Sequence, residues 1–206
     1  VAFKKQYPGV VVNLVEAESI RIQKLLFSGE LDLIIDNYNY SESLYKKTLF
    51  SQETLLLAVP KAMIQKEHEE YLLTAEDIAK KKHLNPESKA VELSMFNGFP
   101  FIALRYGNDT RERLECIRKT QEFRPNVVLE LDQLATAYHV ACNGLGMTIT
   151  SDTLVNETPA DGRLVYFCLK SEEIHRENYF YYKQGKYVSQ AMKVFMEFSA
   201  NMTKNT

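Results

Sequence analysis

Residues 19–36 of the chain read S-I-R-I-Q-K-L-L-F-S-G-E-L-D-L-I-I-D, and this stretch predicts a helix that leads into a strand. Ile22, Leu25 and Leu26 are spaced i, i+3, i+4, which places them on one face of an amphipathic helix. Gly29 can adopt the left-handed backbone conformation that closes a helix. The helix is therefore expected to end there, one turn before the strand begins.

The strand after this helix is expected to be part of a βαβ unit. Residues 31–35 form a short apolar run that is left at Asp36, which is typical of a parallel strand covered on both faces. Residues 10–15, V-V-V-N-L-V, form another apolar run, introduced by the turn Y-P-G. Residues 10–35 thus predict strand, helix and strand, joined by a right-handed crossover.

Three phrases in this region resemble, in order and spacing, the opening of the effector-binding domain of LysR-type transcriptional regulators. They are F-K-K-Q-Y-P-G-V at residues 3–10, E-A-E-S at residues 16–19 and L-L-F-S-G-E-L-D-L-I-I at residues 25–35. Gly29, Leu31 and Asp32 match the most recognisable part of the family pattern.

A second region is similar to the same family. G-L-G-M-T-I at residues 144–149 matches another of its phrases, although Ser151 stands where the family has proline. The resemblance covers most of the chain and is weakest over residues 61–97. It implies two Rossmann-like α/β lobes joined by two crossing strands, as in type 2 periplasmic binding proteins. It also implies a first strand, a linker helix and a helix-turn-helix domain upstream of Val1.

The order of the other predicted elements agrees with two discontinuous lobes. Residues 1–57 with 167–206 are expected to form one lobe, and residues 58–166 the other. The predicted elements are an extended crossing segment at 44–60, strongest at 54–59, a helical segment at 61–73, a helix at 74–80 capped by Thr74 and Asp77, a strand at 99–104, a helix at 111–122, a strand at 127–131, a helix at 133–143 capped by Asp132, a return strand at 163–169, a strand at 179–183 and a closing helix at 188–196.

The composition excludes several classes of protein. The 206 residues are 45% hydrophobic and 25% charged, as in an ordinary globular protein, and the net charge is −2. A nucleic-acid-binding surface across the whole chain is not expected, because such domains are strongly basic; Arg111 and Arg113 are read as part of a solvated helix face. No apolar run approaches the ~20 residues that span a membrane.

The cysteines favour a cytoplasmic protein without disulfides. Cys116, Cys142 and Cys168 are odd in number, widely spaced and without a metal-binding pattern. We expect them to be buried structural residues rather than redox sensors. No cofactor and no metal site is predicted.

The common catalytic motifs are missing from the sequence. It holds no G-x-S-x-G, no phosphate-binding G-x-x-x-x-G-K-[ST] and no H-E-x-x-H. Glu30 and Asp32 are two neighbouring carboxylates, but Asp32 fits better as the residue that orients the entrance of the strand. We therefore predict a protein that is not an enzyme.

Polar residues at strand ends and helix starts are the candidates for binding a ligand, because open α/β sheets place ligand contacts there. Arg105 could clamp a carboxylate or could pair with a nearby acid. The full set is Glu18, Ser19, Asn37, Tyr38, Arg105, Tyr106, Asn108, Thr110, Gln133 and Thr148.

The sequence thus predicts a sensory domain that binds a small effector, with an anion favoured, between its two lobes. The resemblance implies a homodimer or tetramer whose sensory domains associate through residues 1–15, and DNA binding only through the helix-turn-helix domain outside this chain. A solute-binding protein of a transporter is the alternative. A small α/β enzyme is the least supported.

Overall fold

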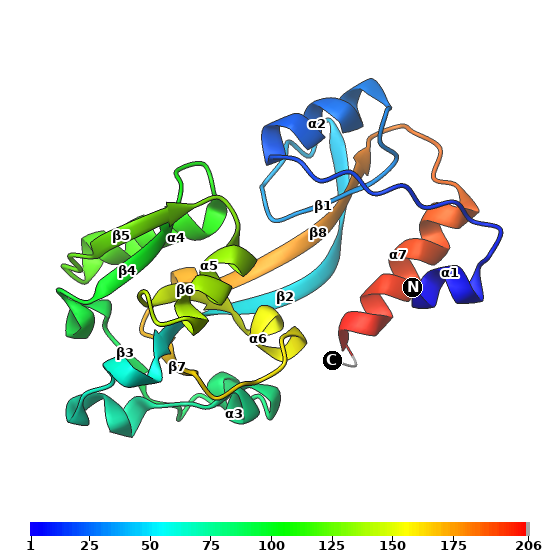
Figure 1. The fold of residues 1–206 in the computed structure, drawn as a ribbon. Coiled ribbons are helices and arrows are strands. Elements are labelled where there is room, and N and C mark those ends of the chain that lie inside the picture. The colour runs from blue at the N-terminus through cyan, green and yellow to red at the C-terminus, as the bar shows by residue number, and fades with distance from the viewer. Residues whose placement is uncertain (205–206) are drawn as a thin grey trace. The chain divides into compact units, whose positions relative to one another are not determined.

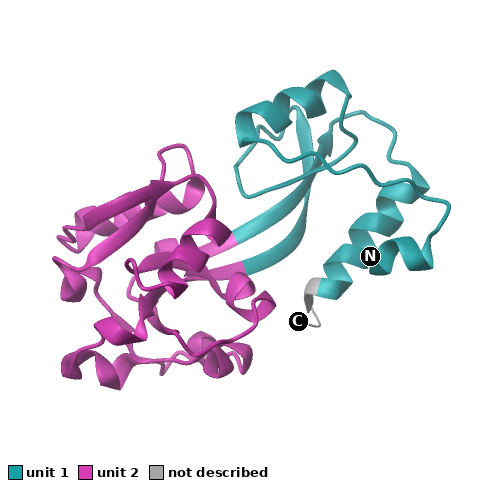
Figure 2. Cartoon of the chain, in the orientation of Figure 1, with its two compact units in different colours: residues 1–52, 177–206 teal, residues 53–176 magenta. Residues whose placement is uncertain are grey.

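The computed structural model describes residues 1–204, and the chain forms two compact units. Residues 1–52 and 177–206 form unit 1, and residues 53–176 form unit 2 (Figure 2). The lobe boundaries predicted from the sequence, at 57/58 and 166/167, remain predictions. Residues 205 and 206 of the predicted first lobe lie outside the described residues.

Unit 1 contains the helix predicted from the opening stretch. Helix α2 (Ser19–Ser28) buries Ile22 and Leu26 and ends at Gly29, whose φ of 87° is left-handed. Helix α1 (Ala2–Gln6) lies against helix α7 (Gln190–Lys204) (Figure 1). The ring of Phe3 is 5.1 Å from that of Phe195 and 5.4 Å from that of Phe198, so aromatic packing joins the two ends of the chain.

The predicted βαβ unit is not formed. Residues 10–18 carry no regular structure, and Val11 and Leu14 are 79% and 90% exposed. Strand β1 (Ile34–Asp36) pairs antiparallel with β8 (His175–Lys183), not parallel with residues 10–15. The predicted crossover and the burial of the strand on both faces are therefore wrong: residues 10–15 have strand composition, but no described strand pairs with them.

Two strands run from one unit into the other. Strand β2 (Tyr45–Pro60) enters unit 2 at residue 53, and β8 leaves it after residue 176. Strand β7 (Leu164–Leu169), the predicted return strand, lies within unit 2. It pairs antiparallel with β2 and parallel with β3 (Ala90–Val91). The sheet runs β1-β8-β2-β7-β3, and β6 (Thr148–Ser151) also pairs with β2.

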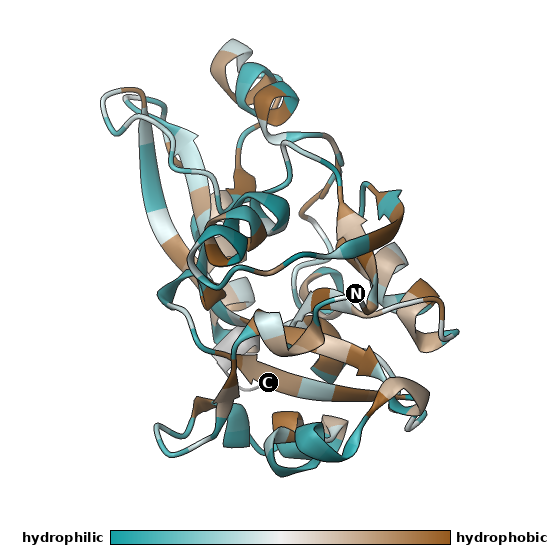
Figure 3. Ribbon diagram, turned by 90° about the vertical axis from the view of Figure 1, so that its left-hand side faces the viewer, coloured by the Kyte–Doolittle hydropathy of each residue, from teal (hydrophilic) through white to brown (hydrophobic). Residues whose placement is uncertain are grey.

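Alternate residues of β2 build two apolar clusters in unit 2. Figure 3 colours each residue of the ribbon by its hydropathy, with hydrophobic residues in brown. Leu55, Leu57 and Val59 belong to one cluster, and Leu56 and Ala58 to the other. This follows from the two-residue period of a strand, which points successive side chains to opposite faces. All five are at most 1% exposed, so this half of β2 is a core strand.

Unit 2 also contains a second, two-stranded parallel sheet. Strand β4 (Pro100–Leu104) pairs with β5 (Asn126–Leu131), with Leu104 opposite Leu131. Each strand leads directly into a helix, β4 into α4 (Asp109–Thr120) and β5 into α5 (Leu134–Cys142). Because the strands are parallel, both helices begin at the same edge of the sheet.

The remaining elements of unit 2 are short. The region 61–73, predicted to be helical, forms two 3₁₀ helices. Helix α3 is confirmed with its predicted cap, in which Thr74 and Asp77 bond each other's backbone amides. These elements are 3₁₀ helices Lys61–Met63, Lys66–Tyr71, Lys82–Leu84, Leu93–Phe96 and Glu172–Ile174, and α-helices α3 (Ala75–Ala79) and α6 (Asp152–Glu157). No helix within residues 1–204 is long and apolar enough to cross a membrane.

Candidate functional site

The edge of unit 2 where α4 and α5 begin holds most of the residues predicted for that unit. Arg105, Tyr106 and Gln133 are exposed there, and Asn108 is half-buried. The side chain of Asn108 accepts a hydrogen bond from the amide of Thr110 at 3.0 Å and donates one to the carbonyl of Asp132 at 3.4 Å. Asn108 therefore caps α4 and also ties its start to the turn before α5.

Arg105 is paired with an acid in this edge. Its Nη1 donates to both carboxylate oxygens of Asp132, at 3.1 and 3.0 Å, and the two side chains are 61% and 71% exposed. Asp132 was predicted to cap α5, but the N-cap residue is Gln133 and its side chain makes no capping bond. Of the two roles open to Arg105 in the sequence, the structure shows the ion pair. An exposed pair of this kind is weak enough for an anionic ligand to compete with it.

Tyr106 lies over a buried arginine. Its ring centre is 4.2 Å from the guanidinium carbon of Arg111, and its side chain is 72% exposed. Arg111 donates to the carbonyl of Leu104 at 3.0 Å and forms ion pairs with Glu115 and Glu130 at 3.0 and 3.2 Å. Arg111 was predicted to lie on a solvated helix face, and this is wrong because it is buried. The buried guanidinium group of Arg111 supports the loop that carries Tyr106 through this cation–π contact.

Two predicted contact residues of unit 2 are engaged inside the protein. Thr110 is 3% exposed and its hydroxyl accepts a hydrogen bond from Arg176 at 3.1 Å. Thr148 is 1% exposed and its hydroxyl donates to the carbonyl of Ile102 at 2.9 Å. Thr110 is still part of the first turn of α4, whereas Thr148 lies within β6. The structure thus groups Thr110 with the edge and does not group Thr148 with it.

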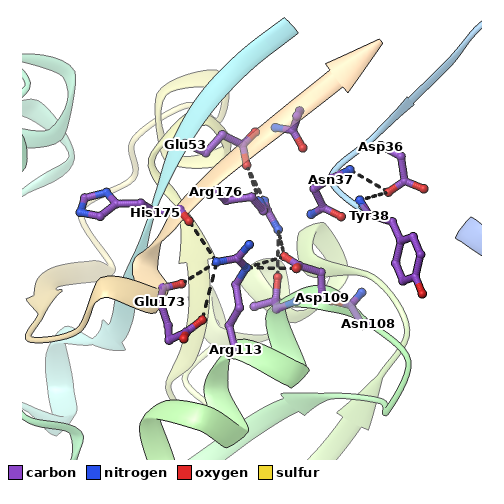
Figure 4. A network of polar contacts seen from close by, with 12 residues as sticks. Asp36, Asn37, Tyr38, Glu53, Asn108, Asp109, Arg113, Glu173, His175 and Arg176 are labelled. Carbon is purple, nitrogen blue, oxygen red and sulfur yellow. Dashed lines mark hydrogen bonds and ion pairs between the residues drawn. The ribbon is translucent and has the colours of Figure 1, made fainter. Parts of the chain in front are cut away.

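Charged residues connect the first turn of α4 to the strands β2 and β8 (Figure 4). Arg176 bonds the carboxylate of Glu53 through Nε, at 3.0 Å, and Nη2, and its Nη1 is 3.6 Å from Asp109. Arg113 donates through Nε to both carboxylate oxygens of Asp109, at 3.0 and 2.9 Å. Its Nη1 donates to the carbonyl of His175 at 3.0 Å.

The four residues predicted in unit 1 lie at the start of α2 and directly after β1. Glu18 is the N-cap residue of α2 and makes no side-chain capping bond. The carboxylate of Asp36 accepts from the amides of Asn37, at 2.7 Å, and Tyr38, at 3.2 Å (Figure 4). Asp36 therefore shapes the turn that presents the side chains of Asn37 and Tyr38.

A buried tyrosine joins these two places in unit 1. The hydroxyl of Tyr40 lies 2.6 Å from Oδ2 of Asp36 and 3.0 Å from the carbonyl of Ser19. Burial, followed by the hydrogen bond to Asp36, raises the pKa of Tyr40 well above its ordinary value, so the hydroxyl remains a donor. Tyr40 thus joins the start of α2, where Glu18 and Ser19 lie, to the turn that carries Asn37 and Tyr38.

Several residues that organise the two groups were not among the sequence candidates. The sequence carries a signal for Asp36, because it ends an apolar run, and for Asp109, because acidic residues favour a first helical turn. Each of the others has at least one partner more than 20 positions away along the chain. The residues are Asp36, Tyr40, Glu53, Asp109, Arg113, Asp132 and Arg176.

A separate open cavity lies at the opposite end of the β4–β5 sheet. Its volume is about 820 Å³. The lining is polar, and two of its side chains already bond backbone groups: Asn97 accepts from the amide of Arg124, and Gln121 from that of Leu93. The lining residues are Glu92, Ser94, Asn97, Gly98, Thr120, Gln121, Glu122 and Arg124.

The cysteines differ from one another in exposure. Cys142 and Cys168 are buried as predicted, and burial raises the pKa of both thiols above the ordinary value. Cys116 is exposed on α4, so the prediction that it is buried is wrong. Within residues 1–204, no group of three or more His, Cys, Asp or Glu side chains could hold a metal ion.

Two α/β units that share two strands, with polar groups at strand ends and helix starts, define a domain with the type 2 periplasmic-binding-protein-like fold. The sequence model described as LysR substrate binding domain matches residues 1–203, and the chain belongs to this family. The predicted fold class and family are confirmed. The family is one of transcriptional regulators, and a transporter solute-binding protein finds no support in the comparisons.

Individual relatives agree with this assignment. The chain is 26% identical over 204 residues to the uncharacterized HTH-type transcriptional regulator YcgK of Bacillus subtilis, covering 99% of this chain and 61% of that protein. It is 26% identical over 121 residues to the RuBisCO operon transcriptional regulator of Acidithiobacillus ferrooxidans, covering 59% of this chain and 39% of that protein. The chain therefore spans less than two thirds of the length of these relatives.

Solved structures share the fold. The regulatory domain of CcmR from Synechocystis PCC6803, in complex with 2-PG, has a TM-score of 0.74 at 21% identity, covering 100% of this chain and 89% of that one. The effector-binding domain of QuiR, in complex with shikimate, has a TM-score of 0.68 at 13% identity, covering 99% of this chain and 88% of that one.

Proposed function

We propose that this LysR-type effector-binding domain senses a small anionic effector at the edge where α4 and α5 begin. The observation that carries the proposal is that both helices start beside each other, with Asn108 bonded to both turns. The amides of a first helical turn point outward and carry partial positive charge, which favours an anion. Arg105, held by a weak and exposed pair, adds a planar donor that suits a carboxylate or phosphate.

The ligands of similar structures support a small polar effector. The domain of QuiR was solved with shikimate, which is a carboxylic acid, and that of CcmR with 2-PG. At these identities the likeness extends to the fold and not to the ligand. The effector of this chain is therefore proposed from the chemistry of its own edge. The Glu18, Ser19, Asn37 and Tyr38 group, and an effector bound between the two units, remain predictions.

The proposed output is control of DNA binding by a helix-turn-helix domain outside this chain, in the cytoplasm. Relatives described as HTH-type regulators support this, since this chain aligns with only part of their length. An effector can shift the regulator only if it binds one conformation more tightly than the other. No catalytic role is proposed for any residue.

We also propose that the domain forms homodimers through residues 1–15, with tetramers as the higher assembly. Val11, Leu14 and Val15 are 79%, 90% and 51% exposed, and apolar groups gathered in one segment favour association. Residues 10–15 have the composition of a strand but no partner strand among the described residues. A second copy of this chain is the occupant that we propose.

A thermal-shift screen of metabolites tests the proposed effector class. The panel includes shikimate, other carboxylates, phosphate esters, neutral sugars and amines. Binding to the folded state raises the melting temperature by mass action, so an anion is expected to do so and Arg105→Gln to reduce the shift. Stabilisation by neutral sugars or cations alone would contradict an anionic effector.

A further inference from the structure

The first turn of α4 is bonded to both strands at the point where they leave unit 2. Glu53 is the first residue of this unit on β2, and Arg176 is its last residue on β8. Arg176 bonds Glu53 through Nε and Nη2, and Thr110 of α4 through Nη1. A single side chain of β8 therefore contacts both β2 and α4 at this place (Figure 4).

The geometry of a guanidinium group makes this contact stiff. Its donors lie in one plane at fixed angles, so a displacement of Thr110 tilts the same plane that holds Glu53. The side chains of Arg176 and Glu53 are 11% and 12% exposed, and a pair shielded from water is stronger than a surface pair. A lysine at position 176 would keep the positive charge but would lack the planar, fixed arrangement of N–H donors.

A second arginine fastens the same turn to the backbone. Arg113 binds both oxygens of Asp109 and donates to the carbonyls of Glu173 and His175, both at 3.0 Å. Asp109 lies next to the helix cap Asn108, in the edge proposed for the effector. Two arginines, Arg113 and Arg176, therefore bond the start of α4 to the beginning of β8 and to the segment before it.

We infer that Arg176 is a positioning residue that transmits a change at the start of α4 to the two strands connecting the units. This regulatory role rests on the proposed function, because the start of α4 is the proposed effector edge. It assigns the coupling to side chains of unit 2 alone.

The test measures a distance between the units without any effector. Cys116 is exposed in unit 2 and accepts a spin label, and Lys24→Cys supplies the second label in unit 1. The other two cysteines are buried. Pulsed electron paramagnetic resonance on the Lys24→Cys protein then gives the distribution of distances between the two spin labels. The same measurement on the protein without Lys24→Cys shows whether labels attach to other cysteines.

Asn108→Ala removes the cap of α4 and serves as the perturbation. We expect it to change the distance distribution when Arg176 is present and to add nothing in Arg176→Gln, which should itself broaden the distribution. Arg176→Lys should behave like Arg176→Gln, because it lacks the fork. Arg163→Gln, which removes an exposed arginine that pairs with Asp161 in unit 2, is the matched control and should leave the distribution unchanged.

Three results would overturn the inference. They are no effect of Asn108→Ala, an equal effect with and without Arg176, and a folded Arg176→Gln protein with an unchanged distribution. If Arg176→Gln does not fold by circular dichroism, Thr110→Val removes only the hydroxyl and should abolish the effect of Asn108→Ala; persistence of that effect would refute the coupling. Since no effector is used, failure here leaves the proposed anion binding standing, and a failed metabolite screen leaves the coupling standing.

Discussion

The guanidinium group of Arg105 donates to both carboxylate oxygens of Asp132, across the turns that precede α4 and α5. Both side chains are mostly exposed, so the ion pair is weak. An anionic ligand could displace the carboxylate of Asp132 from Arg105 at a small cost in free energy. In a sensor for anions, this makes Asp132 a competitor of the effector. The affinity for the effector then depends on how much more tightly Arg105 binds the effector than it binds the carboxylate of Asp132.

Asp132→Asn should therefore strengthen the binding of an anionic effector. Exposed ion pairs are worth ~0–1 kcal/mol, so the expected gain is up to about fivefold in Kd. Isothermal titration with the compound found in the thermal-shift screen measures it. The matched control is Asp161→Asn, which opens another exposed arginine pair, Arg163 with Asp161, and should leave Kd unchanged. Weaker binding in Asp132→Asn would count against competition.

Tyr40→Phe should destabilise unit 1. Tyr40 is 3% exposed, and removing its hydroxyl leaves the Asp36 carboxylate and the Ser19 carbonyl short of a donor. We expect a loss of ~1–3 kcal/mol in the free energy of unfolding by urea. Tyr38→Phe is the control, since Tyr38 is 56% exposed, and its cost should stay within ~0.5 kcal/mol. An equal loss of unfolding free energy in both variants would show that the hydrogen bonds of the Tyr40 hydroxyl do not stabilise unit 1.

The cap of α3 should add an acid-sensitive contribution to stability. The ion pair with Lys82, at 2.6 Å, and then the hydrogen bonds from Thr74 hold the pKa of Asp77 well below its usual range. A carboxyl whose folded pKa is depressed stabilises the fold above its unfolded pKa, about 4, and loses that contribution as pH falls.

Asp77→Asn and Lys82→Met should both make unfolding less sensitive to acid. The difference in urea midpoint between wild type and Asp77→Asn is expected to shrink as pH is lowered from 7 toward 3. The measurement is a series of urea titrations at fixed ionic strength. An undiminished difference at pH 3 would mean that the charge of Asp77 does not stabilise the helix start.

Gly146→Ala should disturb the junction of β4 and β6. A Cβ at this position would lie 2.7 Å from the carbonyl oxygen of Pro100, which is backbone and cannot swing away. Overpacking of this kind costs ~1–3 kcal/mol. Gly9→Ala has nothing within 4 Å and should change the free energy of unfolding by less than ~0.5 kcal/mol. A silent Gly146→Ala would contradict the close approach.

Leu14→Lys should weaken the proposed homodimer. Leu14 is 90% exposed, and an apolar anchor lost from an interface commonly costs more than 1 kcal/mol, so Kd should rise about tenfold. Sedimentation over a range of protein concentrations measures this. Leu84→Lys replaces an apolar residue of unit 2 that is 50% exposed and should have no effect. Dimerisation that Leu14→Lys leaves intact would place the interface elsewhere.

The parts of the fold that depend on neighbouring residues could be predicted from the sequence. Helix α2 and its end at Gly29 follow from a local period and a local backbone preference. The core strand at residues 54–59 follows from an apolar run long enough for both faces to be buried. The family pattern added the discontinuous architecture, which no local period contains.

Strand partners and ion pairs could not be predicted in the same way. Residues 10–15 have the composition of a strand, but strand formation needs a hydrogen-bonding partner, and none of the described strands pairs with them. Ile34–Asp36 was expected to be parallel, yet it pairs with residues almost 150 positions later in the chain. Arg176 and Glu53 are 123 residues apart, so only the folded chain brings them together.

The most direct test of the effector site is amide NMR with the anion found in the screen. Addition of the compound should shift the signals of residues 105–111 and 132–136, where α4 and α5 begin. Asn108→Ala should reduce those shifts at equal ligand concentration. Shifts confined to residues 92–98 and 120–124, which line the cavity at the opposite end of the sheet, would contradict the site proposed for the effector.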